Sequence, residues 1–163
     1  MSNEFAPART PAVVSTPLLI GRREHVALPD WSVQRLCAKV DTGAFSSALE
    51  VAGYELHRDD EGRLLARLVL CLSRRHPTRE TVVLAPVVKM VGVTSSSGER
   101  EQRPLLETAV RLGPLEKRIR MTVTNRSGMR CRMLLGRDAL AGDFVVDVSK
   151  KYLLRLDRSQ ERA

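Results

Sequence analysis

Apolar and polar residues alternate along much of the chain with a period of two, which is typical of half-buried β-strands. The segment 35–40 alternates in this way and ends directly before Asp41, whereas 64–72 is a nearly continuous apolar run, as expected of a buried strand. The segments predicted as strands are 35–40, 54–58, 64–72, 81–93, 105–112, 118–124, 144–148 and 152–156.

The segment 118–124 also predicts which side chains face the core. The residues expected to point inward are Ile119, Met121 and Val123, and those expected to point outward are Arg118, Arg120 and Thr122. Turn-forming residues gather at 59–62 and 94–98, 73–78 is predicted as a basic loop, and only 137–141 has the pattern of a helix. Many short strands with one short helix favour an all-β fold, either a barrel or a sandwich.

The composition is that of a single globular domain. A chain of 163 residues, 43% of them hydrophobic, can bury a substantial core. We expect this domain to span 17–157, between a disordered N-terminal tail at 1–16 and a C-terminal tail at 158–163. No apolar run has the length of a signal peptide or a membrane span. Three cysteines, an odd number without the spacing of a disulfide framework, fit a reducing cytosol, so a cytoplasmic protein is predicted.

The net charge is strongly positive, at +8 with a pI near 10.1, and most of the cations are arginines. Arginine binds carboxylates and phosphates in a bidentate way, so the candidate partners are an acidic peptide or a nucleic acid. Aromatic residues make up only 4% of the chain, which argues against a base-stacking surface and makes nucleic acid the weaker candidate. A solvated surface without a partner is the alternative.

The sequence Asp41-Thr42-Gly43-Ala44 follows the first predicted strand and carries the clearest candidate chemistry. Gly43 allows a sharp turn in which backbone N–H groups can bond the Asp41 carboxylate, and the Thr42 hydroxyl can lock the loop. A carboxylate held in an open turn is the arrangement that aspartic peptidases use. Asp, Thr and Gly are also ordinary turn residues, so a plain hairpin turn is the alternative.

A second segment, 133–140, contains Leu134-Leu135-Gly136-Arg137-Asp138. Together the two segments resemble the retropepsin-type aspartic peptidases, in which two apolar residues and a glycine precede a short helix and support the catalytic loop. The resemblance extends over about 18–155 to a bacterial group long labelled ATP-dependent zinc proteases. The other segments that match this group are 20–24, 39–49, 96–98, 103–104, 125–126, Met129 and 144–148.

The resemblance implies a closed retropepsin-like β-barrel with one short C-terminal helix, and it assigns roles to residues. The catalytic residues would be Asp41, Thr42 and Gly43. The hairpin at 93–101 would be a flap over the substrate, although a plain polar turn is the alternative. The substrate-binding residues would be Ala44, Thr94, Ser95, Ser96, Ser97, Gly98, Arg100 and Arg103. The residues supporting the site would be Leu134, Leu135, Gly136 and Arg137.

Two residues depart from the bacterial group, and they concern the choice of substrate. Phe45 stands where the group has a basic residue, and Glu50 stands where it often has histidine. The remaining candidates to anchor an acidic substrate are Lys39, Arg126 and Arg130.

Neither metal nor ATP is expected as a cofactor. The sequence lacks H-E-x-x-H and the phosphate-binding G-x-x-x-x-G-K-[ST], and its histidines and cysteines are dispersed. Proteins of the group resemble those paired with ATP-grasp ligases that add glutamates, so the ATP would belong to a partner and the substrate would be an acidic or glutamate-extended tail.

The tripeptide Asp-Thr-Gly occurs once, and the chain contains no internal repeat. Aspartic catalysis needs two facing carboxylates, so the resemblance implies a homodimer with one Asp41 from each copy. The function predicted is a metal-independent aspartic-type peptidase that acts on glutamate-rich tails. The alternative is a non-catalytic basic β-barrel that binds an acidic peptide or RNA.

Overall fold

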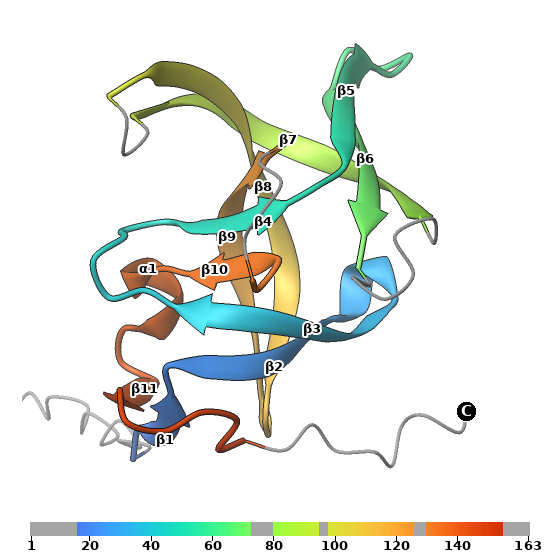
Figure 1. Cartoon of the computed structure of the whole chain (residues 1–163). Coiled ribbons are helices and arrows are strands. Elements are labelled where there is room, and N and C mark those ends of the chain that lie inside the picture. Colours follow the sequence, from blue (N-terminus) through green and yellow to red (C-terminus); the bar gives the residue numbers. More distant parts are fainter. Residues whose placement is uncertain (1–15, 73–79, 95–97, 126–129, 155–163) are drawn as a thin grey trace, which may run out of the picture.

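A computed structural model describes residues 16–72, 80–94, 98–125 and 130–154 (Figure 1). In chain order, its elements are β1 (Leu18–Gly21), β2 (Arg23–Leu28), the 3₁₀ turn η1 (Pro29–Trp31), β3 (Val33–Val40), β4 (Ser47–Glu50), β5 (Gly53–Arg58), β6 (Leu64–Cys71), β7 (Glu80–Thr94), β8 (Arg100–Leu112), β9 (Leu115–Thr124), β10 (Met133–Leu135), α1 (Arg137–Leu140) and β11 (Phe144–Asp147).

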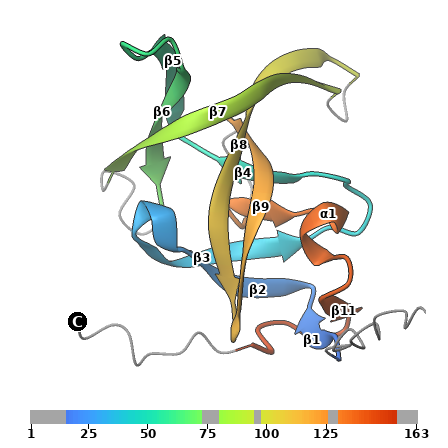
Figure 2. The same ribbon diagram turned by 180° about the vertical axis from the view of Figure 1, so that it is seen from behind.

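Six strands close into a barrel in the order β2-β3-β10-β4-β9-β8, with β8 pairing back onto β2 through Arg111 and Ala27. The predicted all-β barrel with one short C-terminal helix is therefore confirmed. Strands β7, β6 and β5 continue the sheet beyond β8 as an antiparallel arm, which Figures 1 and 2 show extending from the top of the barrel.

The barrel interior is filled by the inward side chains of all six strands. One buried residue from each, in the order β2, β3, β4, β8, β9 and β10, is Leu28, Leu36, Leu49, Leu106, Met121 and Met133. On β3 the buried residues Leu36, Ala38 and Val40 are separated by less buried ones, as the period-two pattern predicts.

Most of the predicted strands lie within strands of the structure, but four strands were missed. The predictions at 35–40, 54–58, 64–72, 81–93, 105–112, 118–124 and 144–148 correspond to β3, β5, β6, β7, β8, β9 and β11. The missed strands are β1, β2, β4 and β10, whose lengths of three to six residues are too short for a clear alternating pattern.

The inward set on β9 was predicted correctly for Ile119, Met121 and Val123, but Thr122 is also buried, with 4% of its surface exposed. Thr122 pairs with Leu105 of β8 and Ala48 of β4, so strands flank it on both edges. Leu105, its direct partner on β8, is also only 8% exposed, and the local pattern along β9 does not reveal this burial.

The segment predicted as a strand at 152–156 is not a strand over its described part, Tyr152 to Leu154. The cause is the buried carboxylate of Glu24, which accepts hydrogen bonds from the N–H groups of Leu153 at 2.9 Å and Leu154 at 3.2 Å. The same carboxylate accepts a bond from the N–H of Gly21 at 2.7 Å. Glu24 therefore replaces a strand partner for the C-terminal segment.

Strands β1 and β11 form a separate parallel pair that lies at the same end of the molecule as the turn after β3 (Figures 1 and 2). Leu19 and Val145 are partners in this pair, and 53% and 54% of their surfaces are exposed.

No helix in the described ranges is long and apolar enough to cross a membrane. The predicted N-terminal tail at 1–16, except for its last residue, lies outside the described residues, as do the predicted tail at 158–163 and the predicted loop at 73–78.

Cys37 of β3 and Cys131, just before β10, form a disulfide with a Cα–Cα distance of 4.9 Å. The expectation that the cysteines form no disulfide framework was therefore wrong for this pair. The two residues are 94 positions apart, and only the parallel pairing of β3 with β10 makes them neighbours. Cys71 lies outside this bond.

We predict that protein purified without reductant and then denatured reacts with a thiol reagent at one site per chain. After reduction, all three cysteines should react. Replacement of Cys71 by Ser should remove the signal seen before reduction. Three reactive thiols in the unreduced protein would contradict the disulfide.

Candidate active site

The backbone of the turn after β3 holds the Asp41 carboxylate. Its Oδ1 atom accepts hydrogen bonds from the N–H groups of Gly43 at 3.0 Å and Ala44 at 3.1 Å. A Cβ at Gly43 would lie 3.3 Å from the same oxygen, so glycine permits this close approach. No described residue donates a bond to Oδ2, and Asp41 is half-buried, which leaves one carboxylate oxygen available for chemistry.

The parallel pairing of β3 with β10 positions this turn. Asp41 N–H donates to the carbonyl of Leu135 at 2.9 Å, which continues the ladder in which Val40 faces Leu135. Lys39 faces Leu134 one step earlier. Leu134 and Leu135 thus support the turn as the resemblance implies.

Gly136 and Arg137 bind the outer side of the same turn. The N–H of Arg137 donates to the Ala44 carbonyl at 2.9 Å, and its guanidinium donates to the carbonyls of Thr42 at 3.1 Å and Gly43 at 3.0 Å. At Gly136, a Cβ would lie 2.5 Å from the backbone carbon of Ser46. The segment therefore lies against this turn at a distance that only glycine allows.

The Thr42 hydroxyl was expected to lock the loop, but it has no hydrogen-bond partner among the described residues, and Thr42 is exposed. The loop is held instead by the guanidinium of Arg137. Sequence reasoning also missed Ser47, a fully buried residue whose Oγ accepts a bond from the N–H of Gly136 at 3.1 Å. A serine directly after a turn carries no signal of its own.

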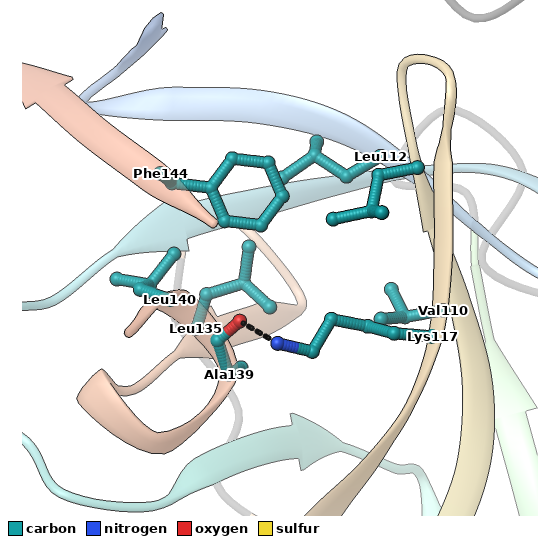
Figure 3. Close-up of a pocket in the computed structure, with 8 residues that line it drawn as sticks. Val110, Leu112, Lys117, Leu135, Ala139, Leu140 and Phe144 are labelled. Atoms are coloured by element: carbon teal, nitrogen blue, oxygen red, sulfur yellow. Dashed lines mark hydrogen bonds between the residues drawn. The ribbon is translucent and has the colours of Figure 1, made fainter. Parts of the chain in front are cut away.

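Lys117 of β9 holds helix α1 in place against the barrel. Its ammonium donates to the carbonyl of Ala139 at 3.2 Å, as Figure 3 shows, and forms an ion pair with Asp143. The apolar residues around this contact enclose a small cavity under α1, and they are Val110, Leu112, Leu115, Leu135, Ala139, Leu140 and Phe144. This cavity packs the helix that presents Arg137 to the turn.

The two residues that depart from the bacterial group have different environments. Glu50 is buried and its carboxylate forms an ion pair with Arg132, so it is bonded inside the protein and does not face the surface. Phe45 is 67% exposed beside the turn, and the Arg137 guanidinium lies 6.0 Å from its ring centroid. Of the two, only Phe45 is placed where a substrate or a second chain could contact it.

The predicted flap is a hairpin in which β7 and β8 pair as far as Thr94 and Arg100. Both views show it projecting toward the same side of the molecule as the turn after β3 (Figures 1 and 2). Gly92, Thr94, Arg100, Glu101 and Gln102 line a hollow on it, and Gly98 has a positive φ of 85°. Ser95, Ser96 and Ser97 lie outside the described residues.

The two flap arginines differ in availability. Arg100 is exposed. Arg103 is only 6% exposed, and its Nε and Nη2 atoms donate to the carboxylate of Glu101 at 2.9 and 2.8 Å. Arg103 would have to give up this ion pair to bind a substrate carboxylate, which makes it a poor substrate ligand.

A third group lies on the outer side of β2 and β3. Tyr152 stacks on His25, with ring centroids 4.3 Å apart, and its hydroxyl lies 3.7 Å from Cys37 Sγ. Partial burial and the neighbouring Arg35 guanidinium lower the pKa of His25, so its ring is neutral near neutral pH.

Within the described ranges, no three His, Cys, Asp or Glu residues gather in a way that could hold a metal ion.

A family model described as "Retropepsin-like aspartic endopeptidase RimB" matches residues 19–156. The chain belongs to the RimB-like family. The resemblance found in the two motif segments is thereby confirmed, and the barrel described above is the retropepsin-like fold of the RimB-like proteins.

Curated relatives of this RimB-like chain are longer proteins with a different name. It is 33% identical over 135 residues to a probable alpha-L-glutamate ligase of Parasynechococcus marenigrum (strain WH8102), covering 80% of this chain and 28% of that protein. It is 31% identical over 149 residues to a probable alpha-L-glutamate ligase of Shewanella pealeana (strain ATCC 700345 / ANG-SQ1), covering 83% and 30%. The chain thus spans less than a third of the length of these relatives.

A solved structure has the same fold as the RimB-like chain. It is the crystal structure of a protein of unknown function from Legionella pneumophila subsp. pneumophila str. Philadelphia 1. The TM-score is 0.72 at 24% identity, over 86% of this chain and all of that one. At this identity, the likeness concerns the fold alone.

We predict that Gly136→Ala lowers the free energy of unfolding by about 1–3 kcal/mol, because its Cβ would overlap the backbone of Ser46. Urea denaturation measures the change. Gly53→Ala is the matched control, since no atom lies within 4 Å of a Cβ at that position. Equal stability of the two variants would show that the loop is not closely packed against Gly136.

Proposed function

We propose that this chain is an aspartic-type peptidase that acts as a homodimer, with the Asp41 carboxylates of two copies facing each other. The observation that carries the proposal is the Asp41 carboxylate, held at Oδ1 by two backbone N–H groups within a RimB-like barrel. The chain contains a single Asp-Thr-Gly, so the second carboxylate has to come from another copy.

In this mechanism, the two carboxylates share one proton, because two adjacent negative charges repel each other. The ionised one takes a proton from a bound water, whose oxygen attacks the scissile carbonyl carbon, while the protonated one donates a hydrogen bond to the carbonyl oxygen. The C–N bond then breaks as the amine nitrogen takes a proton. One water is consumed, and one carboxyl and one amine product are released.

The neighbouring residues have positioning roles in this scheme. The contacts of Gly136 and Arg137 with the turn fix the position of its backbone, and therefore of Asp41. The N–H groups of Gly43 and Ala44 keep the Asp41 Oδ1 atom oriented. The hairpin of β7 and β8 would close over the substrate and exclude water. None of these steps uses a metal ion or ATP.

The proposed substrate is an acidic peptide, such as a glutamate-extended protein tail. Two observations support it: the relatives are named probable alpha-L-glutamate ligases, and the chain carries a net charge of +8. A peptidase that trims added glutamates would act on the product of such a ligase. A basic protein also attracts a polyanionic tail and raises its association rate.

The same charge favours a second candidate function, a basic barrel that binds an acidic peptide or RNA without cleaving it. The two functions differ in what they require of Asp41. Binding to a cationic surface gains nothing from a carboxylate held in a turn, whereas hydrolysis depends on it.

We predict that Asp41→Asn reduces hydrolysis of a glutamate-rich peptide by at least about a hundredfold, because asparagine keeps the shape but cannot act as a base. Mass spectrometry of the products measures the rate, and circular dichroism checks the fold. A variant with most of the wild-type rate would exclude the aspartic mechanism. Peptide binding without cleavage by the wild type would favour the binding module.

We predict that the active species is a dimer whose interface includes α1 and the C-terminal segment around Tyr152 to Leu154. The exposed β1–β11 pair lies at the same end of the barrel, so we include it in the proposed interface. Val145→Glu should shift sedimentation to the monomer and abolish activity, because it buries a charge in the interface. Leu84→Glu, at a residue of β7 that is 56% exposed, is the matched control and should remain dimeric. A monomer that hydrolyses peptide at nanomolar concentration would contradict the proposal.

A further inference from the structure

Lys39 lies on the same face of the barrel wall as the candidate catalytic residue. Val40 points into the core and is only 8% exposed, so strand alternation puts Lys39 and Asp41 together on the opposite face. Lys39 is exposed. Arg23 of β2 is its direct partner in the antiparallel ladder and therefore lies beside it on that face.

Along the outer face of β2 and β3, the Arg23–Lys39 pair has a different neighbour on each side. The next ladder pair on this face is His25 with Cys37, and the Tyr152 ring covers it by stacking on His25 with its hydroxyl 3.7 Å from Cys37 Sγ. On the other side, β3 ends at the Asp41 turn. Arg23 and Lys39 thus stand between an aromatic ring and the candidate catalytic carboxylate.

Neither member of the pair has an ion-pair partner in the described part of the chain. Many other cations do have one, and they are Arg63, Arg103, Lys117, Arg118, Arg120 and Arg132. The closest acid in sequence, Glu24, is fully buried and bonded to the backbone N–H groups of Gly21, Leu153 and Leu154. The positive charge beside Asp41 is therefore not neutralised from within the described ranges.

We infer that Arg23 and Lys39 form the subsite that binds an acidic side chain next to the scissile bond. This inference rests on the proposed function and names the residues that select its substrate. Alternate residues of a strand are about 6.6 Å apart, which is also the repeat of an extended substrate. A substrate whose scissile carbonyl lies at Asp41 therefore brings a neighbouring side chain over Lys39.

The symmetry of the proposed dimer adds a consequence. Each copy contributes one Arg23–Lys39 pair, and a two-fold axis through the Asp41 residues places one pair on each side of the scissile bond. The subsites then favour a bond between two glutamates. Arg103, which the sequence suggested for this role, is already bonded to Glu101.

The test uses four peptides of equal length that differ only at the two residues flanking one bond, which are Glu–Glu, Glu–Gln, Gln–Glu or Gln–Gln. We expect wild-type kcat/KM to be about a hundredfold higher for Glu–Glu than for Gln–Gln, with each carboxylate contributing about tenfold. Lys39→Gln should reduce this ratio at least about tenfold, the double variant with Arg23→Gln should bring it close to one, and Lys39→Arg should retain most of it.

Arg67→Gln is the matched control, because Arg67 is an exposed cation on β6 and its loss changes the net charge by the same amount. Its Glu–Glu to Gln–Gln ratio should stay at the wild-type value. An equal loss of the ratio in Arg67→Gln and Lys39→Gln would overturn the subsite, because overall charge would then explain the preference. An unchanged ratio in the Arg23 and Lys39 double variant would also overturn it.

A binding measurement separates this inference from the proposed function. Asp41→Asn, with and without Lys39→Gln, is titrated with fluorescent Glu–Glu and Gln–Gln peptides, and anisotropy gives the two dissociation constants. Tighter binding of Glu–Glu that depends on Lys39 supports the subsite even if the wild type cleaves none of the peptides, in which case only the peptidase proposal fails. Binding without any dependence on Lys39 overturns the subsite.

Discussion

The close contact between Gly136 and the loop after β3 is the constraint on which the rest of the site depends. Without a Cβ at Gly136, the backbone of this segment reaches the loop, and the polar groups of the two segments satisfy each other. The ladder from β10 reaches Asp41 N–H, the N–H of Arg137 reaches Ala44, and the guanidinium of Arg137 reaches Thr42 and Gly43. Two segments almost a hundred residues apart therefore form one rigid support, and the carboxylate needs only the N–H groups of its own turn to be oriented.

The cations on the barrel differ in whether a nearby acid neutralises them. Several arginines away from the turn are neutralised by nearby acids, as in the pairs Arg118–Glu107 and Arg132–Glu50, and these pairs connect neighbouring parts of the sheet. Others, such as Arg67 and Arg100, are exposed without an ion pair among the described residues. Arg23 and Lys39, beside Asp41, are not paired within the described residues. A net charge of +8 is therefore less informative than its placement, because a cation without a partner can accept a ligand without giving up an existing interaction.

The C-terminal segment contributes to this arrangement through a single buried carboxylate. Glu24 accepts the N–H groups of Leu153 and Leu154, and this brings Tyr152 onto His25 next to the cation pair. The β1–β11 pair lies at the same end of the barrel, with Leu19 and Val145 exposed. One end of the molecule thus combines the carboxylate, the unpaired cations and an apolar surface, and this is the end through which the proposed dimer would form.

The amino-acid sequence by itself determined the strand content and the two motif segments, because alternation and turn residues are local properties. Strands β3, β5 to β9 and β11 and helix α1 were predictable for this reason, whereas the place of Gly136 against the turn after β3 was predicted from the resemblance. The tertiary structure alone decided the barrel order, the Cys37–Cys131 disulfide, the burial of Thr122 and Ser47, and the pairing of Arg103 with Glu101. Each of these depends on which strand lies beside which, and the contacts that decide it join residues far apart in the chain, where no local pattern of side chains records the neighbour.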